Sequence, residues 1–159
     1  MRKQILGNST PVTAPSDDLL DIATLAAATI TSEDPAHPLE NAFDGQRGPG
    51  SSYWQAATPD LQTITLAFDT PQTLRQIVLE IEETQATRSQ ELVLAYSQDG
   101  GQTYREIQRQ GYNFSPPGTT WEREEWQVNC DRLTHLRLEI DPDKEGRQAP
   151  ARLTTLILR

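Results

Sequence analysis

The sequence predicts an all-β protein, built as a single-domain antiparallel β-sandwich of the jelly-roll type. Short segments in which apolar and polar residues alternate recur along the chain, and turn-forming residues separate them. Almost no stretch has the 3.6-residue period of a helix. The chain has 159 residues, which is long enough to bury one substantial core without a metal or a disulfide. Strands of this kind bury their apolar faces by packing two sheets against each other.

The first 21 residues mix Gly, Pro, Ser, Thr and Asp without a sustained period, which predicts a flexible N-terminal arm. We expect the folded domain to span residues 22–159. Its first strand is expected at 25–31, because the β-branched end of this segment outweighs the helix propensity of its alanines. Residues 38–43 predict one helical turn with Pro38 near its start.

The other strands follow from alternating side chains. In the clearest case Leu92, Leu94 and Tyr96 alternate with polar or small residues, and Asp99-Gly100 supplies the tight turn of a β-hairpin whose second arm carries Tyr104. The remaining expected strands are 64–68, 77–82, 126–130, 136–140 and 153–158. Each of them places apolar side chains on one face and polar side chains on the other, except the last, which is apolar on both faces.

The lengths of the connections predict where a binding surface lies. Successive antiparallel strands reverse direction, so consecutive connections fall at alternate ends of the sandwich. The short connections are 69–73, 98–101 and 131–133, and the long ones are 32–60, 83–89, 110–120 and 141–150. We therefore expect the four long loops to form a rim at one end, and loops on a rigid scaffold commonly carry binding residues.

Seven side chains on or beside these loops are candidate ligand-binding residues. Aromatic faces stack on sugar rings, and Arg and Asn side chains hydrogen-bond to hydroxyls or carboxylates. The candidates are Arg47, Arg88, Tyr112, Asn113, Phe114, Trp121 and Arg147. Tyr53, Glu83, Asp141 and Asp143 are expected at the same rim. For Tyr112, Phe114 and Trp121, packing inside the protein is an alternative that the sequence leaves open.

Composition and missing motifs argue against several function classes. A net charge of −9 and a pI near 4.6 repel phosphate backbones and anionic lipids, so neither nucleic acid nor a membrane is expected as a partner. His37 and His135 have no zinc-binding spacing and no accompanying nucleophile motif, so we do not expect an enzyme. Cys130 is the only cysteine, and polar residues interrupt any signal-like run in 1–30, so a cytoplasmic location is expected.

Four pieces of the sequence, in a fixed order, form a more specific pattern. They are 37–45 followed by 53–54, 64–68 followed by 74–79, the hairpin 91–107 with its Ser-x-Asp-Gly, and 136–140. This pattern, over residues 22–158, resembles the coagulation factor 5/8 type C (discoidin) family of the galactose-binding-like superfamily. The resemblance implies a jelly roll that binds rather than catalyses, since members recognise glycans, phospholipid heads or proteins through their long loops; for this chain we expect carbohydrate recognition. An intracellular protein-interaction module on the same fold is the alternative, so the partner is expected to be a glycan or a protein.

The same resemblance implies a structural Ca²⁺ beside the Asp-Gly loop. Asp44 would be a ligand, with Ser51 or Ser52 in place of the family's Thr before the aromatic-Trp pair. Two departures from the family pattern matter. Thr154 or Thr155 replaces the acidic residue often found near the start of the last strand, which weakens the metal site, and the cysteine pair of secreted members is missing.

Overall fold

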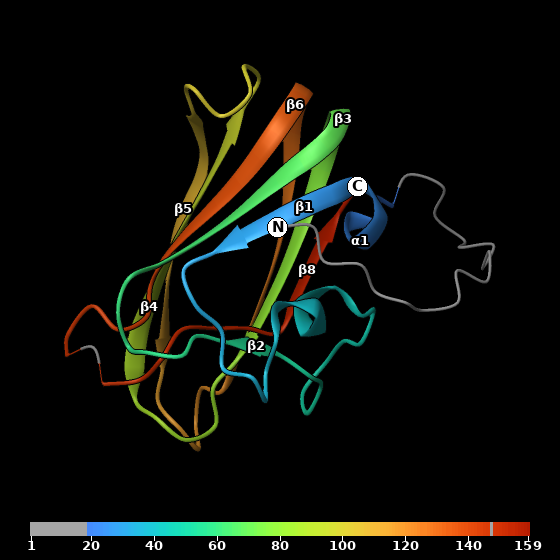
Figure 1. The fold of residues 1–159 in the computed structure, drawn as a ribbon. Coiled ribbons are helices and arrows are strands. Elements are labelled where there is room, and N and C mark those ends of the chain that lie inside the picture. Colours follow the sequence, from blue (N-terminus) through green and yellow to red (C-terminus); the bar gives the residue numbers. More distant parts are fainter. Residues whose placement is uncertain (1–18, 147) are drawn as a thin grey trace.

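Two layers of antiparallel strands face each other in the computed structural model, which describes residues 19–146 and 148–159 (Figure 1). The strands are β1 (Ala26–Ile30), β2 (Trp54–Gln55), β3 (Gln62–Glu82), β4 (Arg88–Ser97), β5 (Arg105–Phe114), β6 (Trp121–Asp141), β7 (Arg152–Leu153) and β8 (Thr155–Leu158). Six of them are hydrogen-bonded in the order β1-β3-β6-β4-β5, with β8 beside β3, and β2 pairs with β7. The predicted all-β antiparallel sandwich is confirmed.

Two short helical segments precede the long strands. The single turn α1 (Ile22–Leu25) leads directly into β1, and the 3-10 helix η1 (Leu39–Phe43) follows Pro38. The predicted first strand and the predicted helical turn are both confirmed. No helix within the described residues is long and apolar enough to cross a membrane. Most of the predicted N-terminal arm, residues 1–18, lies outside the described part of the chain.

Strands β3 and β6 differ from the prediction, because each is 21 residues long where two shorter strands were expected. The two strands pair along their whole lengths, but the register shifts three times between Ala67 and Gln76. Pro71 lies in this stretch and cannot donate to the ladder, and on β6 Arg132 adopts φ 53°. At this point the two-stranded ribbon of β3 and β6 bends and continues from one layer into the other (Figure 1).

The turned ribbon places the two halves of β3 in different layers. The first half pairs with β1 through Ile64–Phe68, and the second half pairs with β8 through Ile77–Glu80. The β4–β5 hairpin loop lies at the same end as the turn, while the longer loops gather at the opposite end (Figure 1). The grouping of long loops at one rim, which the alternation of connections predicted, is therefore confirmed.

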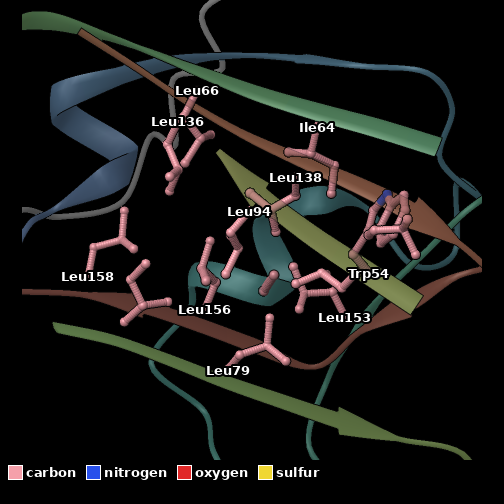
Figure 2. Close-up of a cluster of buried hydrophobic side chains, with 14 of the residues drawn as sticks. Trp54, Ile64, Leu66, Leu79, Leu94, Leu136, Leu138, Leu153, Leu156 and Leu158 are labelled. Carbon is pink, nitrogen blue, oxygen red and sulfur yellow. The ribbon is translucent and has the colours of Figure 1, made fainter. Parts of the chain in front are cut away.

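The core fills the space between the two layers (Figure 2). Inward side chains of one layer meet those of the other, and they are Ile64, Leu66, Leu94, Leu136 and Leu138 on one side and Leu79, Leu156 and Leu158 on the other. Each is at most 2% exposed. Burying an aliphatic side chain of this size stabilises the fold by about 1.5–3 kcal/mol. Trp54, also fully buried, extends this core to the long-loop end.

Candidate functional site

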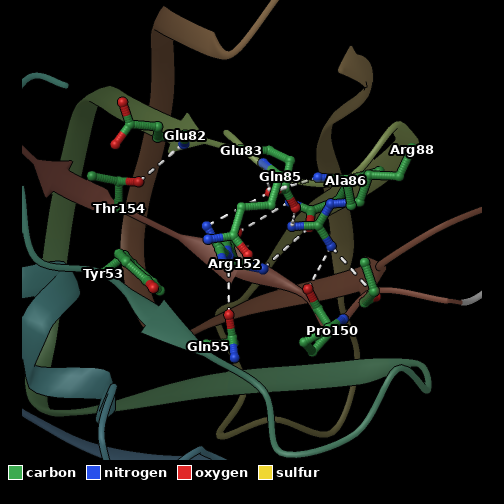
Figure 3. A network of polar contacts seen from close by, with 12 residues as sticks. Tyr53, Gln55, Glu82, Glu83, Gln85, Ala86, Arg88, Pro150, Arg152 and Thr154 are labelled. Atoms are coloured by element: carbon green, nitrogen blue, oxygen red, sulfur yellow. Dashed lines mark hydrogen bonds and ion pairs between the residues drawn. The ribbon is translucent and has the colours of Figure 1, made fainter. Parts of the chain in front are cut away.

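A cluster of polar side chains at the long-loop end begins with the pairing of β2 and β7. Trp54 lies opposite Leu153, and Gln55 lies opposite Arg152. Trp54 and Leu153 are fully buried, and because side chains alternate along a strand, Gln55 and Arg152 face the other way. Two residues that are 97 positions apart in the sequence thereby lie side by side at the rim (Figure 3).

The guanidinium of Arg152 is held from three sides. Its Nε donates a hydrogen bond of 2.9 Å to Gln55 Oε1, and its central carbon lies 4.5 Å from the centroid of the Tyr53 ring. One Nη lies 3.7 Å from a carboxylate oxygen of Glu83. The side chain remains 14% exposed. A permanent positive charge is therefore fixed in one orientation at the edge of solvent.

Two residues of the preceding loop complete this arrangement. The ring of His37 stacks on that of Tyr53 with centroids 4.2 Å apart, and His37 Nε2 lies 3.2 Å from the Tyr53 hydroxyl. Gln55 Nε2 donates to Asp34 Oδ2 at 3.4 Å. The backbone amides of Gln55 and Asp34 donate to the carbonyls of His37 and Gln55, respectively, which pins this loop onto β2. We call the set Asp34, His37, Tyr53, Gln55 and Arg152 the rim cluster; all five are partly exposed.

A buried ion pair lies beside Arg152 of the rim cluster (Figure 3). Glu83 and Arg88 approach to 2.9 Å, and their side chains are 2% and 0% exposed. Glu83 also accepts hydrogen bonds from the amides of Gln85 and Ala86 in its own loop. Burial lowers the pKa of Arg88, while the charge of Glu83 opposes that shift. The guanidinium keeps its charge, because arginine is not deprotonated in proteins.

Arg88 also joins two loops that are distant in sequence. Its Nη1 donates to carbonyl oxygens of the loop after β6, which are those of Pro142 (3.3 Å), Ala149 (3.4 Å) and Pro150. The loop that contains Glu83 and the loop that leads to Arg152 are thus tied together by one buried side chain. This support keeps the rim cluster on a rigid base rather than on free loops.

Comparison with known proteins agrees with the fold described above. The model of the F5/8 type C domain matches residues 26–148, which is more than half of the chain. The chain belongs to this family. Among proteins with curated descriptions, none matches the sequence significantly. The predicted discoidin resemblance is confirmed.

Solved structures of carbohydrate-binding modules share the fold of this F5/8 type C domain. CBM32-3 from a family 31 glycoside hydrolase of Clostridium perfringens is 19% identical, with a TM-score of 0.62 over 89% of this chain and 94% of that one. The family 32 module of C. perfringens NanJ, solved with galactose, is 12% identical, with a TM-score of 0.62 over 89% and 97%. A C. perfringens GH89 CBM32 module, solved with GalNAc-β-1,3-galactose, is 20% identical, with a TM-score of 0.56 over 88% and 98%.

The loop in which the family resemblance implies calcium is closed by bonds between protein groups. Asp44 accepts hydrogen bonds from the amide of Gln46 and from the hydroxyl of Ser52, so both of its oxygens are used. The hydroxyl of Thr155 donates to the carbonyl of Gln46 at 3.0 Å. No group of three or more acidic, His or Cys side chains suited to a metal occurs in the described ranges. Since calcium takes six to eight oxygens, backbone carbonyls of residues 39–52 would have to complete a shell around Asp44. Calcium binding by Asp44, Ser51 or Ser52 stays a prediction.

The structure corrects the expected exposure of three candidate ligand-binding residues in this F5/8 type C domain. Tyr112 and Phe114 are 2% and 1% exposed and pack in the core, so no ligand reaches their rings. Arg88 is buried in its pair with Glu83. The alternative interpretation, packing inside the protein, therefore holds for both aromatic residues.

Three of the other candidates keep some exposure but lie on separate segments. Arg47 and Asn113 are exposed, and Trp121 is partly exposed at the start of β6. Arg147 lies outside the described residues. A ligand-binding role for these four residues stays a prediction.

Sequence reasoning missed four members of the rim cluster. Asp34, Gln55 and Arg152 were not singled out, and His37 was not given a binding role. Tyr53 was expected at the rim. The only local signal for Gln55 was its position after a buried Trp, where alternation turns the next side chain outward. Nothing in the sequence near Arg152 indicates its partner, because that contact depends on pairing across almost the whole domain.

Proposed function

We propose that this protein is a carbohydrate-recognition module and that the rim cluster binds the sugar. The observation that carries the proposal is the fixed, partly exposed guanidinium of Arg152, held between Tyr53 and Gln55. A side chain that is already immobilised loses little conformational entropy when it binds a ligand. Its remaining N–H groups can donate to sugar hydroxyls in a defined direction.

The rim cluster offers hydrogen bonds rather than an open aromatic face. His37 and Arg152 both lie against the Tyr53 ring, and two planar groups at these distances cannot share one face. Tyr53 therefore presents its hydroxyl instead of a stacking surface. Asp34 and Gln55 add acceptors and an amide donor next to it. A polyhydroxylated ligand matches this mixture of closely spaced donors and acceptors.

Comparison with known structures supports a glycan as the ligand class. Two of the similar modules were solved with galactose or a galactose-containing disaccharide, and these ligands belong to those proteins. We propose recognition without catalysis, because the most buried carboxylate near the site, Glu83, is already occupied by Arg88 and two backbone amides. An intracellular protein-interaction role is the alternative outcome of the test.

A glycan array followed by calorimetry on the best sugar tests the proposal. Arg152→Ala is expected to weaken binding about tenfold or more, because each hydrogen bond to a charged group contributes about 1.5–3 kcal/mol. Arg75→Ala is the matched control. Arg75 also sits in an ion pair, with Asp131 at 2.7 Å, but half of its side chain is exposed and it lies near the turned end of the ribbon.

The proposal fails if no sugar on the array binds, or if Arg152→Ala binds the sugar as tightly as the unmodified protein. In the first case, affinity capture from a lysate would test the protein-interaction alternative. In the second case, the sugar binds somewhere other than the rim cluster. Similar melting temperatures for both variants would show that a loss of binding does not come from unfolding.

A further inference from the structure

The outer face of the larger layer carries a groove whose origin lies in the register of three strands. On β4, Val93 lies between Glu139 of β6 and Arg109 of β5, and Ala95 follows it on the same face. Short side chains on the middle strand are thus flanked by long ones on both neighbours. The result is a cavity of about 520 Å³ along β4. We call it the β4 trough, and its sides are formed by Glu106, Arg109, Arg137 and Glu139 over the floor of Val93 and Ala95.

Carboxylates outnumber guanidinium groups around the β4 trough. Four acidic and two arginine side chains line it. Arg109 is shared between Glu91 at 3.1 Å and Glu106 at 3.0 Å, and Arg137 pairs with Glu139 at 3.0 Å. Hydrogen bonding from Lys144, with the nearby charge of Arg109, lowers the pKa of Glu91, which keeps it ionised near neutral pH. With Lys144, which lies 3.0 Å from Glu91, three cationic side chains face four acidic ones, and the net charge of the whole chain, −9, adds to this excess of one and favours a cationic ligand.

These ion pairs can be rearranged at low cost. The side chains of Glu106, Glu139 and Arg109 are 51%, 51% and 55% exposed. Exposed ion pairs contribute little to stability, because water and salt screen them and the long side chains lose entropy when fixed. A ligand ammonium can therefore replace Arg109 next to Glu106, which frees Arg109 to donate to ligand hydroxyls, while Arg137 stays over the Tyr104 ring at 3.9 Å from its centroid.

We propose that the β4 trough binds an oligosaccharide that carries free amino groups. The distance along β4 from Glu91 to Ala95 is about 13 Å, enough for a short chain of sugar rings rather than a single ring. Val93, which is partly exposed, offers the apolar face of a ring a contact next to the buried Ala95, while the flanking carboxylates accept hydrogen bonds from the amino groups. This site lies on strands, separate from the loops that carry the rim cluster.

A basic peptide fits the β4 trough less well than a sugar does. Strand β4 is hydrogen-bonded to β5 on one side and to β6 on the other, so its backbone has no free edge here. Extended peptides gain much of their affinity by adding a strand to such an edge. A sugar does not need backbone partners, because its hydroxyl and amino groups bind side chains.

Calorimetry with the full chain tests the proposal, using a glucosamine oligosaccharide and its fully N-acetylated counterpart. The amino form is expected to bind more tightly, and added salt is expected to weaken it. Replacing Glu106 and Glu139 together by Gln is expected to lower its affinity about tenfold, because two charged acceptors are lost. Glu125→Gln is the matched control, since Glu125 is 46% exposed and ion-paired to Arg123 on the other layer.

Several results would overturn the proposal. Equal affinity for the amino and acetylated forms would show that charge is not recognised. An unchanged affinity in the double Gln variant would remove the β4 trough as the site. Loss of amino-sugar binding in Arg152→Ala, with the double Gln variant unaffected, would assign the sugar to the rim cluster and leave the proposed function standing. If a lysine-rich peptide competed equally well with the amino sugar, the β4 trough would be a surface that binds cations in general rather than a sugar site.

Discussion

At the scale of single residues, the hydroxyl of Tyr112 is costly to bury. The ring is 2% exposed, and its hydroxyl has no hydrogen-bond partner among the described residues. Burial, with the charges of Glu124 and Glu122, raises the pKa of Tyr112 above its ordinary value, so the group stays neutral. The residue therefore combines a favourable apolar ring with an unfavourable polar atom.

Tyr112→Phe is expected to keep or increase the free energy of unfolding, because an unsatisfied buried polar group costs about 1–3 kcal/mol. Tyr112→Ala is expected to lower it by about 3–5 kcal/mol, because the core loses an aromatic ring. Urea unfolding of both variants measures the difference. A clear loss of stability in Tyr112→Phe would mean that the hydroxyl has a partner in solution.

Asp99 predicts a pH-dependent contribution to stability. Hydrogen bonds from the Thr103 hydroxyl and then the Ser97 hydroxyl lower the pKa of Asp99. A carboxyl group with a lowered folded-state pKa stabilises the fold above its unfolded-state pKa, near 3.9, and this contribution is lost as the pH falls through the folded-state pKa. Asp99→Ala is therefore expected to lower the melting temperature at pH 7, with a smaller difference at strongly acidic pH. If the difference in melting temperature between Asp99→Ala and the unmodified protein were the same at every pH, the lowered pKa of Asp99 would not be its cause.

The buried candidates show which residue-level signal decides exposure. Flanking Pro and Gly residues suggested that Tyr112 and Phe114 lie in an exposed loop. Yet they are separated by one residue, the exposed Asn113, and this buried-exposed-buried alternation belongs to strand β5. Arg88 could not be placed from sequence, since its burial depends on Glu83 and on carbonyls of a loop more than 50 residues away.

At the scale of elements, the sequence predicted which faces of the strands point inward but not how the strands join. The alternation in 64–68 and 136–140 is local, so it survives in the structure as the inward faces of β3 and β6. The turn of the ribbon requires both strands to shift register together, and no local pattern reports on a partner strand. Strand β7 has only two residues, too few for any period, and this is why Arg152 was missed.

Two substitutions on β6 are expected to lower the free energy of unfolding by different amounts, because the two side chains differ in burial. Leu138 is fully buried between the layers, so Leu138→Ala is expected to lower the free energy of unfolding by about 2–5 kcal/mol. Trp126 packs against the core but is only partly buried. Trp126→Ala is therefore expected to fall below the roughly 3–5 kcal/mol of a fully buried aromatic. Urea unfolding of the two variants checks this, and an equal or larger loss for Trp126 would mean that it is more buried in solution.

The loop that contains Asp44 can be held either by its own hydrogen bonds or by a bound calcium ion, and the response of stability to calcium separates the two. Hydrogen bonds between protein groups close the loop without a metal. The Thr155 hydroxyl donates one of them, and the carboxylates of Glu80 and Glu82 accept two more from the backbone amides of Gly48 and Gly50. A chelator is therefore expected to leave the melting temperature unchanged, and Thr155→Val is expected to lower it. A rise in melting temperature and a heat of binding at millimolar calcium, both lost in Asp44→Ala, would instead confirm the calcium site implied by the family resemblance.

At the scale of the whole molecule, charge and topology have separate consequences. The net charge of −9 disfavours anionic partners at any site on the surface, the rim cluster and the β4 trough included. The expectations that nucleic acid and membranes are not partners, and that the protein is cytoplasmic, stay predictions. Topology affects the folding rate, because β3 pairs with β6 across sequence separations such as that between Gln62 and Ile140, and such long-range pairing slows folding.

Because β3 and β6 run through both layers, we expect the two layers to unfold together. We expect one cooperative transition in urea, with a slope of about 1–3 kcal/mol per molar. A variant that keeps only Trp54, made by Trp121→Phe and Trp126→Phe, reports by fluorescence on the core at the long-loop end, where Trp54 is fully buried. Far-UV circular dichroism reports on all strands, and the unmodified protein controls for the substitutions. Two separated midpoints would show that the rim and its buried Trp54 unfold independently of the ribbon.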